Sequence, residues 1–219
     1  ADAPAPPDAR QRLSRRVISL RREVERLRGI LGDFLAYAGE MRLDQHPLDL
    51  NQLIDELSDF FQPQAEQSRV RLRCDLAAGP LMVSVDSGLL KQAALNLMLN
   101  AVQALGEPPA PGTPQAGVTR ELILRTRRLA EREGADRVLL HVIDTGPGIP
   151  PEVQAKLFTP YFTTKAGGSG LGLATTRRII EAHQGRIELH SEPGRGTDFT
   201  ISLPAAEAAP PSSEASGTG

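Results

Sequence analysis

The chain has 219 residues, with 25 basic and 27 acidic side chains, a net charge of −2, and 40% hydrophobic residues. This length suits one sizeable domain with an appendage, and the near-neutral charge argues against a dedicated nucleic-acid binder. No apolar run approaches the ~20 residues of a membrane span, and the single cysteine, Cys74, cannot form an internal disulfide.

The two ends of the chain are rich in Ala, Pro, Ser and Gly, so we expect residues 1–9 and 205–219 to be disordered. Residues 10–46 carry apolar side chains at alternating steps of four and three, which is typical of a coiled coil. These positions are Leu13, Val17, Leu20, Val24, Leu27, Leu31, Phe34, Ala38 and Met41. A single helix of this length cannot bury the stripe alone, so we expect it to pair with another helix. The arginines between the apolar positions are interpreted as a solvated face.

Pro47 ends this pattern, and Asp49 is a plausible N-cap for an amphipathic helix that begins at Leu50. Residues 70–76 alternate between apolar and charged, which predicts a half-buried strand with Cys74 facing the core. A short strand over residues 81–85 then leads to a helix over residues 87–105, for which Ser87 is the expected N-cap.

A Pro-rich loop separates this helix from the strands that we predict over residues 121–126 and 138–143. A glycine-rich loop then precedes a helix over residues 171–183. Two further strands, over residues 186–190 and 197–203, complete the predicted elements.

Amide side chains form a stripe on the helix predicted over residues 87–105. Gln92, Asn96, Asn100 and Gln103 fall within an arc of roughly 80°, and the rest of the helix is nearly all apolar. A solvated face would carry Lys and Glu, so the stripe indicates polar groups that line an internal cavity. Amide oxygens suit Mg²⁺ and amide nitrogens can donate to phosphate. Amides that cap loops or bond one another would give the same pattern.

The stretch VLLHVIDTGPGIP is an apolar strand that ends in Asp144 and is followed by Gly146 and Gly148. A carboxylate there can accept a hydrogen bond from an exocyclic amine, and the glycines allow close approach of backbone to a flat ligand. An ordinary Asp-initiated turn is the alternative. An aspartic-protease loop would need a second Asp-Thr-Gly, and the chain has one.

The stretch KAGGSGLGLATTRRII places several glycines immediately before a predicted helix, where backbone N–H groups and the helix dipole favour a phosphate. It is neither a Walker A loop nor a dinucleotide fingerprint. A flexible loop is the alternative, and mobility would itself suit a lid. Just upstream, Phe158 and Phe162 could anchor such a lid, and Lys165 could meet phosphates or remain a solvated lysine.

Five motifs occur in order: NLMLNAVQAL, DTGPGIP, LFTPYFTTK, GGSGLGLA and EPGRGTDFTISLP. Together they resemble the catalytic ATP-binding domain of sensor histidine kinases, most closely of the nitrogen-regulation type. The resemblance covers residues 47–204 and implies an α+β fold, a Bergerat-type two-layer α/β sandwich in which a mixed sheet packs on helices. Residues 10–46 then resemble the second helix of the dimerisation and phosphoacceptor hairpin, a long coiled-coil-like helix that precedes the sandwich.

In this family ATP lies between the sheet and the helices beneath a lid. The resemblance implies that Asn100 coordinates Mg²⁺, that Asn96 supports the metal and the phosphates, and that Asp144 binds the adenine amino group. The remaining implied nucleotide contacts are Gly146 and Gly148 beside the base, Thr197 near the adenine, Gly168, Gly170, Leu171 and Gly172 over the phosphates, and Lys165 as a weaker phosphate candidate.

Two positions depart from the family pattern. Gln103 stands where many relatives carry a basic residue, so the phosphate contact of that residue must come from elsewhere or be absent. Related ATP hydrolases carry a Glu at the place of Asn96 to activate water. Its absence favours phosphotransfer over hydrolysis, since such a base is typically worth about 10²–10⁴-fold.

A phosphoacceptor histidine of this family lies on the first hairpin helix and is followed by an acidic residue. His46, His141, His183 and His190 do not fit that description, and we interpret all four as structural. We therefore expect a chain that starts after the acceptor helix, binds ATP or ADP, and does not phosphorylate itself.

The resemblance also implies partners for the chain. We expect a homodimer through the N-terminal helix, contact with the phosphoacceptor helix of the same kinase and with a response regulator, and no nucleic acid. The expected location is cytoplasmic, and a membrane anchor in a parent protein is left open. The competing hypothesis is a catalytically inactive nucleotide-binding or dimerising regulatory module of the same fold.

Overall fold

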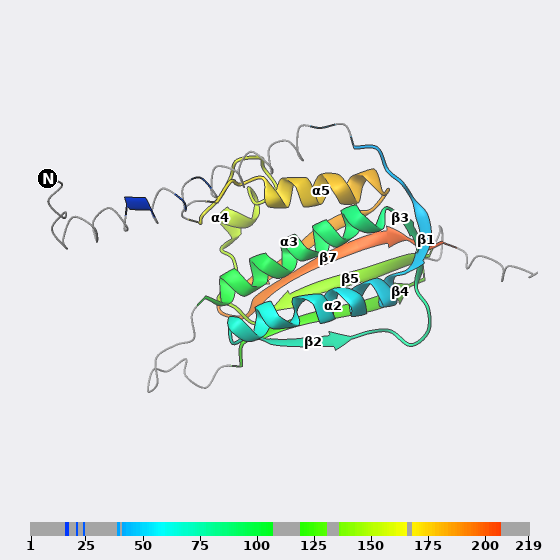
Figure 1. The fold of residues 1–219 in the computed structure, drawn as a ribbon, viewed down its shortest axis with the longest axis horizontal. Helices are drawn as coiled ribbons and strands as arrows, with labels where there is room; N and C mark the ends of the chain where they lie inside the picture. The colour runs from blue at the N-terminus through cyan, green and yellow to red at the C-terminus, as the bar shows by residue number, and fades with distance from the viewer. Residues whose placement is uncertain are drawn as a thin grey trace, which may run out of the picture.

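Helices cover one face of a five-stranded sheet in the computed structural model of this protein (Figure 1). The structure describes residues 16, 17, 21, 24, 39, 41–106, 119–130, 136–165 and 168–206. The elements are β1 (His46–Asp49), α2 (Leu50–Gln67), β2 (Arg71–Asp75), β3 (Met82–Val85), α3 (Ser87–Leu105), β4 (Glu121–Leu129), β5 (Arg137–Asp144), α4 (Pro151–Gln154), α5 (Gly172–Ala182), β6 (Arg186–Glu192) and β7 (Gly196–Pro204).

The main sheet has the strand order β2-β4-β5-β7-β6. Strand β2 pairs parallel with β4, and the other neighbours are antiparallel, so the sheet is mixed. Helices α2, α3 and α5 lie together on one side of it, and β1 pairs with β3 in a separate two-stranded sheet at one end (Figure 1). The predicted two-layer α/β sandwich with a mixed sheet is confirmed.

The core lies between the sheet and the helices because successive side chains of a strand point to opposite faces. Every second residue of the three central strands is buried, and these apolar residues are Leu122, Leu124, Val138, Leu140, Val142, Phe199, Ile201 and Leu203. The intervening positions face away from the helices and include Arg125, His141 and Thr200.

Aspartates cap the two long helices. Asp49 Oδ1 accepts hydrogen bonds from the backbone N–H of Asn51 at 3.0 Å and of Leu81 at 2.9 Å, which confirms the predicted cap of α2. For α3 the prediction of Ser87 is wrong, because Ser87 is already helical and the cap is Asp86. Asp86 has an extended backbone, and its Oδ1 accepts from the backbone N–H of Leu89 at 3.0 Å.

The prediction that Cys74 belongs to the core is also wrong, because Cys74 is exposed. Its register with the buried Leu124 places its side chain on the helix side of the sheet, where its Sγ lies 3.2 Å from Ser58 Oγ. Strand β2 is an edge strand, so the helix layer does not extend far enough to cover this thiol.

Strand β1 and the short helix α4 were not predicted. Pro47, which is predicted to end the helical pattern, lies within β1, where a two-stranded sheet tolerates a residue without an N–H. At the other end, Ala205 and Ala206 donate to the carbonyls of Asp136 and Met82, so the first residues of the predicted tail still lie against the domain. Most of the predicted tail falls outside the described residues, as does the segment 1–9.

The N-terminal coiled-coil prediction also lies largely outside the described residues. Of its apolar positions, Val17 and Val24 are described, and both are helical and more than half exposed. Within the described residues, no helix combines the length and the apolar character that a membrane span requires.

His183 joins the end of α5 to the beginning of α3. The side chain is buried, its Nδ1 lies 2.7 Å from the carbonyl oxygen of Ile179, and its Nε2 accepts from the backbone N–H of Asp86 at 2.9 Å. The acceptor role of Nε2 requires the neutral tautomer with the proton on Nδ1. Both ring nitrogens are therefore used in holding the two helices, in keeping with a structural histidine.

Replacing His183 by Leu should lower the free energy of unfolding by about 2 kcal/mol, because the Asp86 N–H would lose its buried acceptor. Urea denaturation measures this loss. The matched control is His190→Leu, at a side chain that is 84% exposed, which should change stability by less than about 0.5 kcal/mol. Equal losses for the two variants would contradict the assigned role.

Candidate functional site

The second half of α3 lies beside residues of three other sequence motifs, at the start of α5, at Lys165 and in the loop after Asp144. Its apolar side is buried against the core through residues such as Leu97, Met98 and Ala101. The amides of the other side are half-buried at Asn96 and Asn100 and exposed at Gln103. The predicted polar stripe therefore exists, and it faces the segment from α4 to the start of α5.

Asn96 contacts the beginning of α5. Its Nδ2 donates to the buried hydroxyl of Thr176 at 2.8 Å. A Cβ on Gly172, the first residue of α5, would lie 2.7 Å from Asn96 Oδ1. Only glycine lets the start of α5 approach the amide this closely. The position of Asn96 therefore depends on the glycine at position 172.

Asn100 and Gln103 bind the ammonium group of Lys165. Lys165 Nζ donates to Asn100 Oδ1 at 2.5 Å and to Gln103 Oε1 at 2.6 Å. The residue as a whole is exposed, but its charged end lies against α3, and this desolvation lowers the pKa of Lys165. These hydrogen bonds place the Lys165 ammonium on the amide stripe, a contact that the sequence does not predict.

Asp144 is a buried carboxylate at the end of β5, with 4% of its surface exposed. It accepts a hydrogen bond from the Gly146 N–H at 2.8 Å and further ones from the N–H and hydroxyl of Thr197, its partner across β7. Burial outweighs these hydrogen bonds and raises the pKa of Asp144 from an ordinary 3.8 to about 6. A buried carboxylate with an unfavourable charged form is a candidate for recognising a ligand donor.

Glycines allow the loops around Asp144 to pack without side chains. A Cβ on Gly146 would lie 2.7 Å from Asp144 Oδ1 and 3.7 Å from the backbone of Ala104 at the end of α3. Gly148 has φ +70°, and its Cβ would lie 2.1 Å from the carbonyl oxygen of Glu192. The close approach of Gly148 is thus to the β6–β7 turn, which gives a structural reason for this glycine.

The predicted lid is described except for residues 166 and 167. Gly170 has φ +68°, and its carbonyl accepts from the Tyr161 N–H at 3.0 Å. Gly168 donates to the Lys165 carbonyl at 3.2 Å. The side chain of Leu171 is buried, so this residue could offer a ligand only its main chain.

Phe158 anchors the segment that leads to Lys165. Its ring packs edge-on against Phe199 of β7, with centroids 6.3 Å apart, and the Arg177 guanidinium lies 5.7 Å from its centre. These contacts tie the segment to the sheet and to α5. The predicted anchoring role of Phe158 agrees with this packing.

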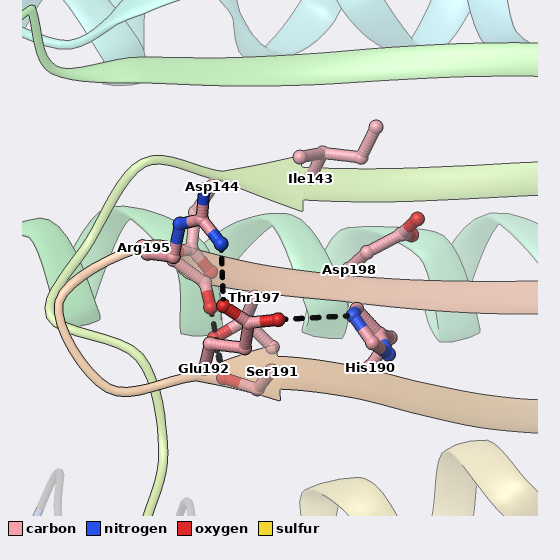
Figure 2. A pocket seen from close by; sticks show the side chains of 9 residues that line it. Ile143, Asp144, His190, Ser191, Glu192, Arg195, Thr197 and Asp198 are labelled. Atoms are coloured by element: carbon pink, nitrogen blue, oxygen red, sulfur yellow. Dashed lines mark hydrogen bonds and ion pairs between the residues drawn. The ribbon is translucent and has the colours of Figure 1, made fainter.

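A hollow of about 230 Å³ lies at the ends of β5 and β6 and the beginning of β7 (Figure 2). Its wall includes Asp144 and Thr197, and in Figure 2 the Glu192 carboxylate lies between Arg195, at 2.8 Å, and His190, at 4.0 Å. Ile143 and Asp198 alternate with Asp144 and Thr197 along their strands, so their side chains point away from the helices. This hollow is therefore distinct from the space between the sheet and α3.

The donor set suits a metal that arrives with a ligand better than a metal held by the protein alone. Among the described residues, no group of three or more His, Cys, Asp or Glu side chains could hold an ion. Mg²⁺ commonly keeps several waters and takes phosphate oxygens with few protein ligands. A single amide oxygen, that of Asn100, fits that role.

The sequence-predicted site residues thus fall into three contacting groups. Asn96 meets Gly172, Asn100 meets Lys165, and Asp144 meets Gly146 and Thr197. Gly148 contacts the β6–β7 turn, and Gly168, Gly170 and Leu171 lie in the lid segment.

Sequence reasoning missed two residues that shape the site. Gly196 has φ +97°, and a Cβ there would lie 2.0 Å from the Asp144 carbonyl oxygen. Thr176 is the partner of Asn96. The EPGRG stretch was a visible turn signal for Gly196, whereas nothing in the local sequence marks Thr176.

Comparisons with known proteins agree with these features. The model of the histidine kinase-, DNA gyrase B- and HSP90-like ATPases matches residues 85–207. The sensor histidine kinase ZraS of Salmonella typhi is 36% identical over 183 residues, which are 84% of this chain and 36% of ZraS. The chain thus spans about a third of the length of this relative.

Two solved structures share the fold. Full-length ShkA in complex with AMPPNP has a TM-score of 0.73 at 27% identity, covering 90% of this chain and 40% of ShkA. The histidine kinase ThkA in complex with the response regulator protein TrrA has a TM-score of 0.68 at 27% identity, covering 94% of this chain and 53% of that one.

Gly148→Ala should destabilise the domain by about 3 kcal/mol or more, because the new Cβ adds a backbone clash to the unfavourable φ. The matched control is Gly194→Ala, where φ is +83° but nothing lies within 4 Å of a Cβ, and the expected cost is about 1–2 kcal/mol. Thermal or urea denaturation compares the two. Similar losses would show that conformation alone, without close packing, requires the glycine.

Asp144→Asn should stabilise the domain near neutral pH. The folded-state pKa of about 6 exceeds the ordinary 3.8, so Asp144 does not penalise folding below about pH 4 and penalises it increasingly up to about pH 6. At neutral pH this cost is about 3 kcal/mol as an upper figure, and asparagine removes it. The gain should disappear near pH 4, as measured by urea denaturation at both pH values.

The control for this pH dependence is Asp75→Asn. Hydrogen bonds from Arg127 and Arg125 lower the pKa of Asp75, so its substitution should destabilise the domain at neutral pH and matter less in acid. If Asp144→Asn also lost stability at neutral pH, burial would not be the dominant influence on that carboxyl.

Proposed function

The chain belongs to the sensor histidine kinases, within the histidine kinase-, DNA gyrase B- and HSP90-like ATPases, and we propose that it binds Mg²⁺–ATP and transfers the γ-phosphate to a histidine outside this chain. The observation that carries the proposal is the meeting of three motifs along α3. Gly172 lies against Asn96, Lys165 bonds Asn100, and the loop of Asp144 approaches the end of the helix through Gly146.

The adenine would bind at the end of β5. A buried carboxylate such as Asp144 can accept from the exocyclic amine, and charge makes that hydrogen bond stronger. The hydrogen bonds from Gly146 and Thr197 hold the carboxylate in place. Without a Cβ, Gly146 leaves room for a flat base beside it, and Gly148 orders the loop behind it.

The phosphates would lie between α3 and the lid. Asn100 would hold Mg²⁺, which supplies neutralising charge to the phosphate oxygens when bound. Asn96, fixed by Thr176, supports this position. Gly168, Gly170, Leu171 and Gly172 would close over the phosphates at the start of α5, and Lys165 would add a cation.

Phosphoryl transfer of this kind depends mainly on positioning and charge. Asn96 is an amide that cannot act as a general base toward water, so the site is suited to hold ATP until an imidazole reaches the γ-phosphate. His183 uses both ring nitrogens within the fold, and His141 bonds Asp198 at 3.0 Å. The acceptor is therefore expected elsewhere, on the phosphoacceptor helix of the same kinase.

The proposed assembly is a homodimer through the N-terminal helix, acting on a response regulator in the cytoplasm without nucleic acid. The exposed Val17 and Val24 are consistent with a helix stripe that another helix covers. The ThkA relative was solved with a response regulator protein, which supports a partner of that class.

A second candidate function is a nucleotide-binding or dimerising regulator that has lost turnover. The observation in its favour is Gln103, which replaces the basic residue that many relatives carry. This alternative predicts nucleotide binding without phosphotransfer.

Calorimetric titration of ADP, with and without Mg²⁺, tests the binding site. The parent chain should bind ADP more tightly with Mg²⁺. Asp144→Ala should weaken binding about tenfold or more, whereas Asn100→Ala should remove most of the Mg²⁺ dependence. A matched control is Gln64→Ala, at an exposed amide of α2 outside the amide stripe. A folded parent that binds no ADP would contradict the proposal.

A phosphotransfer assay separates the two candidate functions. The chain is incubated with labelled ATP and a separate acceptor-helix peptide that contains the histidine. Acid-labile phosphate on the peptide supports the kinase, and binding without transfer supports the regulator. Acid-labile phosphate on this chain alone would overturn the interpretation of its four histidines.

A further inference from the structure

We propose that Gln103 is a positioning residue, which holds the Lys165 ammonium on α3 so that Lys165 supplies the phosphate-binding cation that position 103 itself lacks. This inference rests on the proposed function. It assigns to the Gln103–Lys165 pair a contact that many relatives make with one basic side chain.

The geometry of the pair comes from two elements distant in the sequence. Asn100 and Gln103 are three residues apart on α3 and therefore neighbours on its surface. Lys165 reaches them from the segment that Phe158 anchors. Its Nζ lies 2.5 Å from Asn100 Oδ1 and 2.6 Å from Gln103 Oε1, which places the charge on the amide stripe.

The chemistry of the partners leaves the charge uncompensated. Both acceptors are neutral amide oxygens, so they orient the ammonium without neutralising it. Lys91, the charged side chain on the same helix, is instead paired with the carboxylate of Glu56 at 2.9 Å. An ammonium held by amides can form a stronger, charge-assisted hydrogen bond when a phosphate arrives.

The second amide acceptor also matters because Asn100 has a second proposed role. Lys165 Nζ and Mg²⁺ would compete for the same atom, Asn100 Oδ1. Because Gln103 provides a second acceptor, Lys165 would stay bound to α3 if Asn100 held the metal. A lysine has three donors, so the Gln103 contact leaves donors for phosphate oxygens.

The test uses the full chain in calorimetric titrations with a non-hydrolysable ATP analogue plus Mg²⁺, and separately with adenosine. Lys165→Met should weaken binding of the analogue about tenfold, the loss of one charge-assisted hydrogen bond, and leave adenosine unchanged. Gln103→Ala should weaken binding of the analogue by about threefold to tenfold, because Lys165 is then no longer held in position to make its hydrogen bond. Gln64→Ala, at an exposed amide of α2, is the control, and thermal unfolding checks that each variant is folded.

Double variants distinguish positioning from a general structural role. In the Lys165→Met background, Gln103→Ala should have no further effect, because the residue acts through Lys165. Gln103→Lys in that background should restore binding of the analogue, because it places a cation on α3 directly.

Three results would overturn the inference: a Lys165→Met variant that binds the analogue as the parent does, additive losses in the double variant, or an equal loss of adenosine binding. A parent that binds neither ligand would instead overturn the proposed function.

Discussion

The architecture of the site depends on the packing of α3 against the sheet. Leu97, Met98 and Ala101 are fully or almost fully buried, and this burial fixes the rotation of the helix. Once the apolar side is fixed, Asn96 and Asn100 can point only toward the lid segment. The hydrophobic core therefore determines which polar groups are presented to a ligand, although it contains none of them.

The buried carboxylate shows a second relation between folding and binding. Asp144 is a carboxylic side chain at a buried position, where desolvation disfavours its charged form. Backbone hydrogen bonds and Thr197 offset part of that penalty. A ligand that donates a hydrogen bond and excludes the remaining water would offset more of it, so binding of such a ligand and domain stability would be coupled through this side chain.

Regular patterns made most of the fold predictable. The alternation in β4, β5 and β7 and the apolar face of α3 follow directly from burial, and the motif order led to the two-layer sandwich. The errors were positional. Asp86 and Ser87 are both good caps, and only the backbone conformation selects between them. Cys74 alternates correctly but lies at an edge, a fact that strand order alone determines.

Some of the candidate site residues could likewise be predicted from the sequence, and others could not. Asn96, Asn100 and Asp144 could be found because motif and periodicity coincide at them. The contact of Gln103 with Lys165 could not, because the two residues are far apart in the chain and a glutamine carries no charge to suggest a partner. Thr176 was invisible for a similar reason, since its hydroxyl acts only when α5 lies against α3.

The tie between His183 and Asp86 has a mechanical consequence. It joins the C-terminal end of α5 to the N-terminal end of α3, while Gly172, the first residue of α5, lies against Asn96 in the middle of α3. Helix α5 is therefore held against α3 at both of its ends. A ligand beside α3 would meet a pair of helices whose relative position is set before binding.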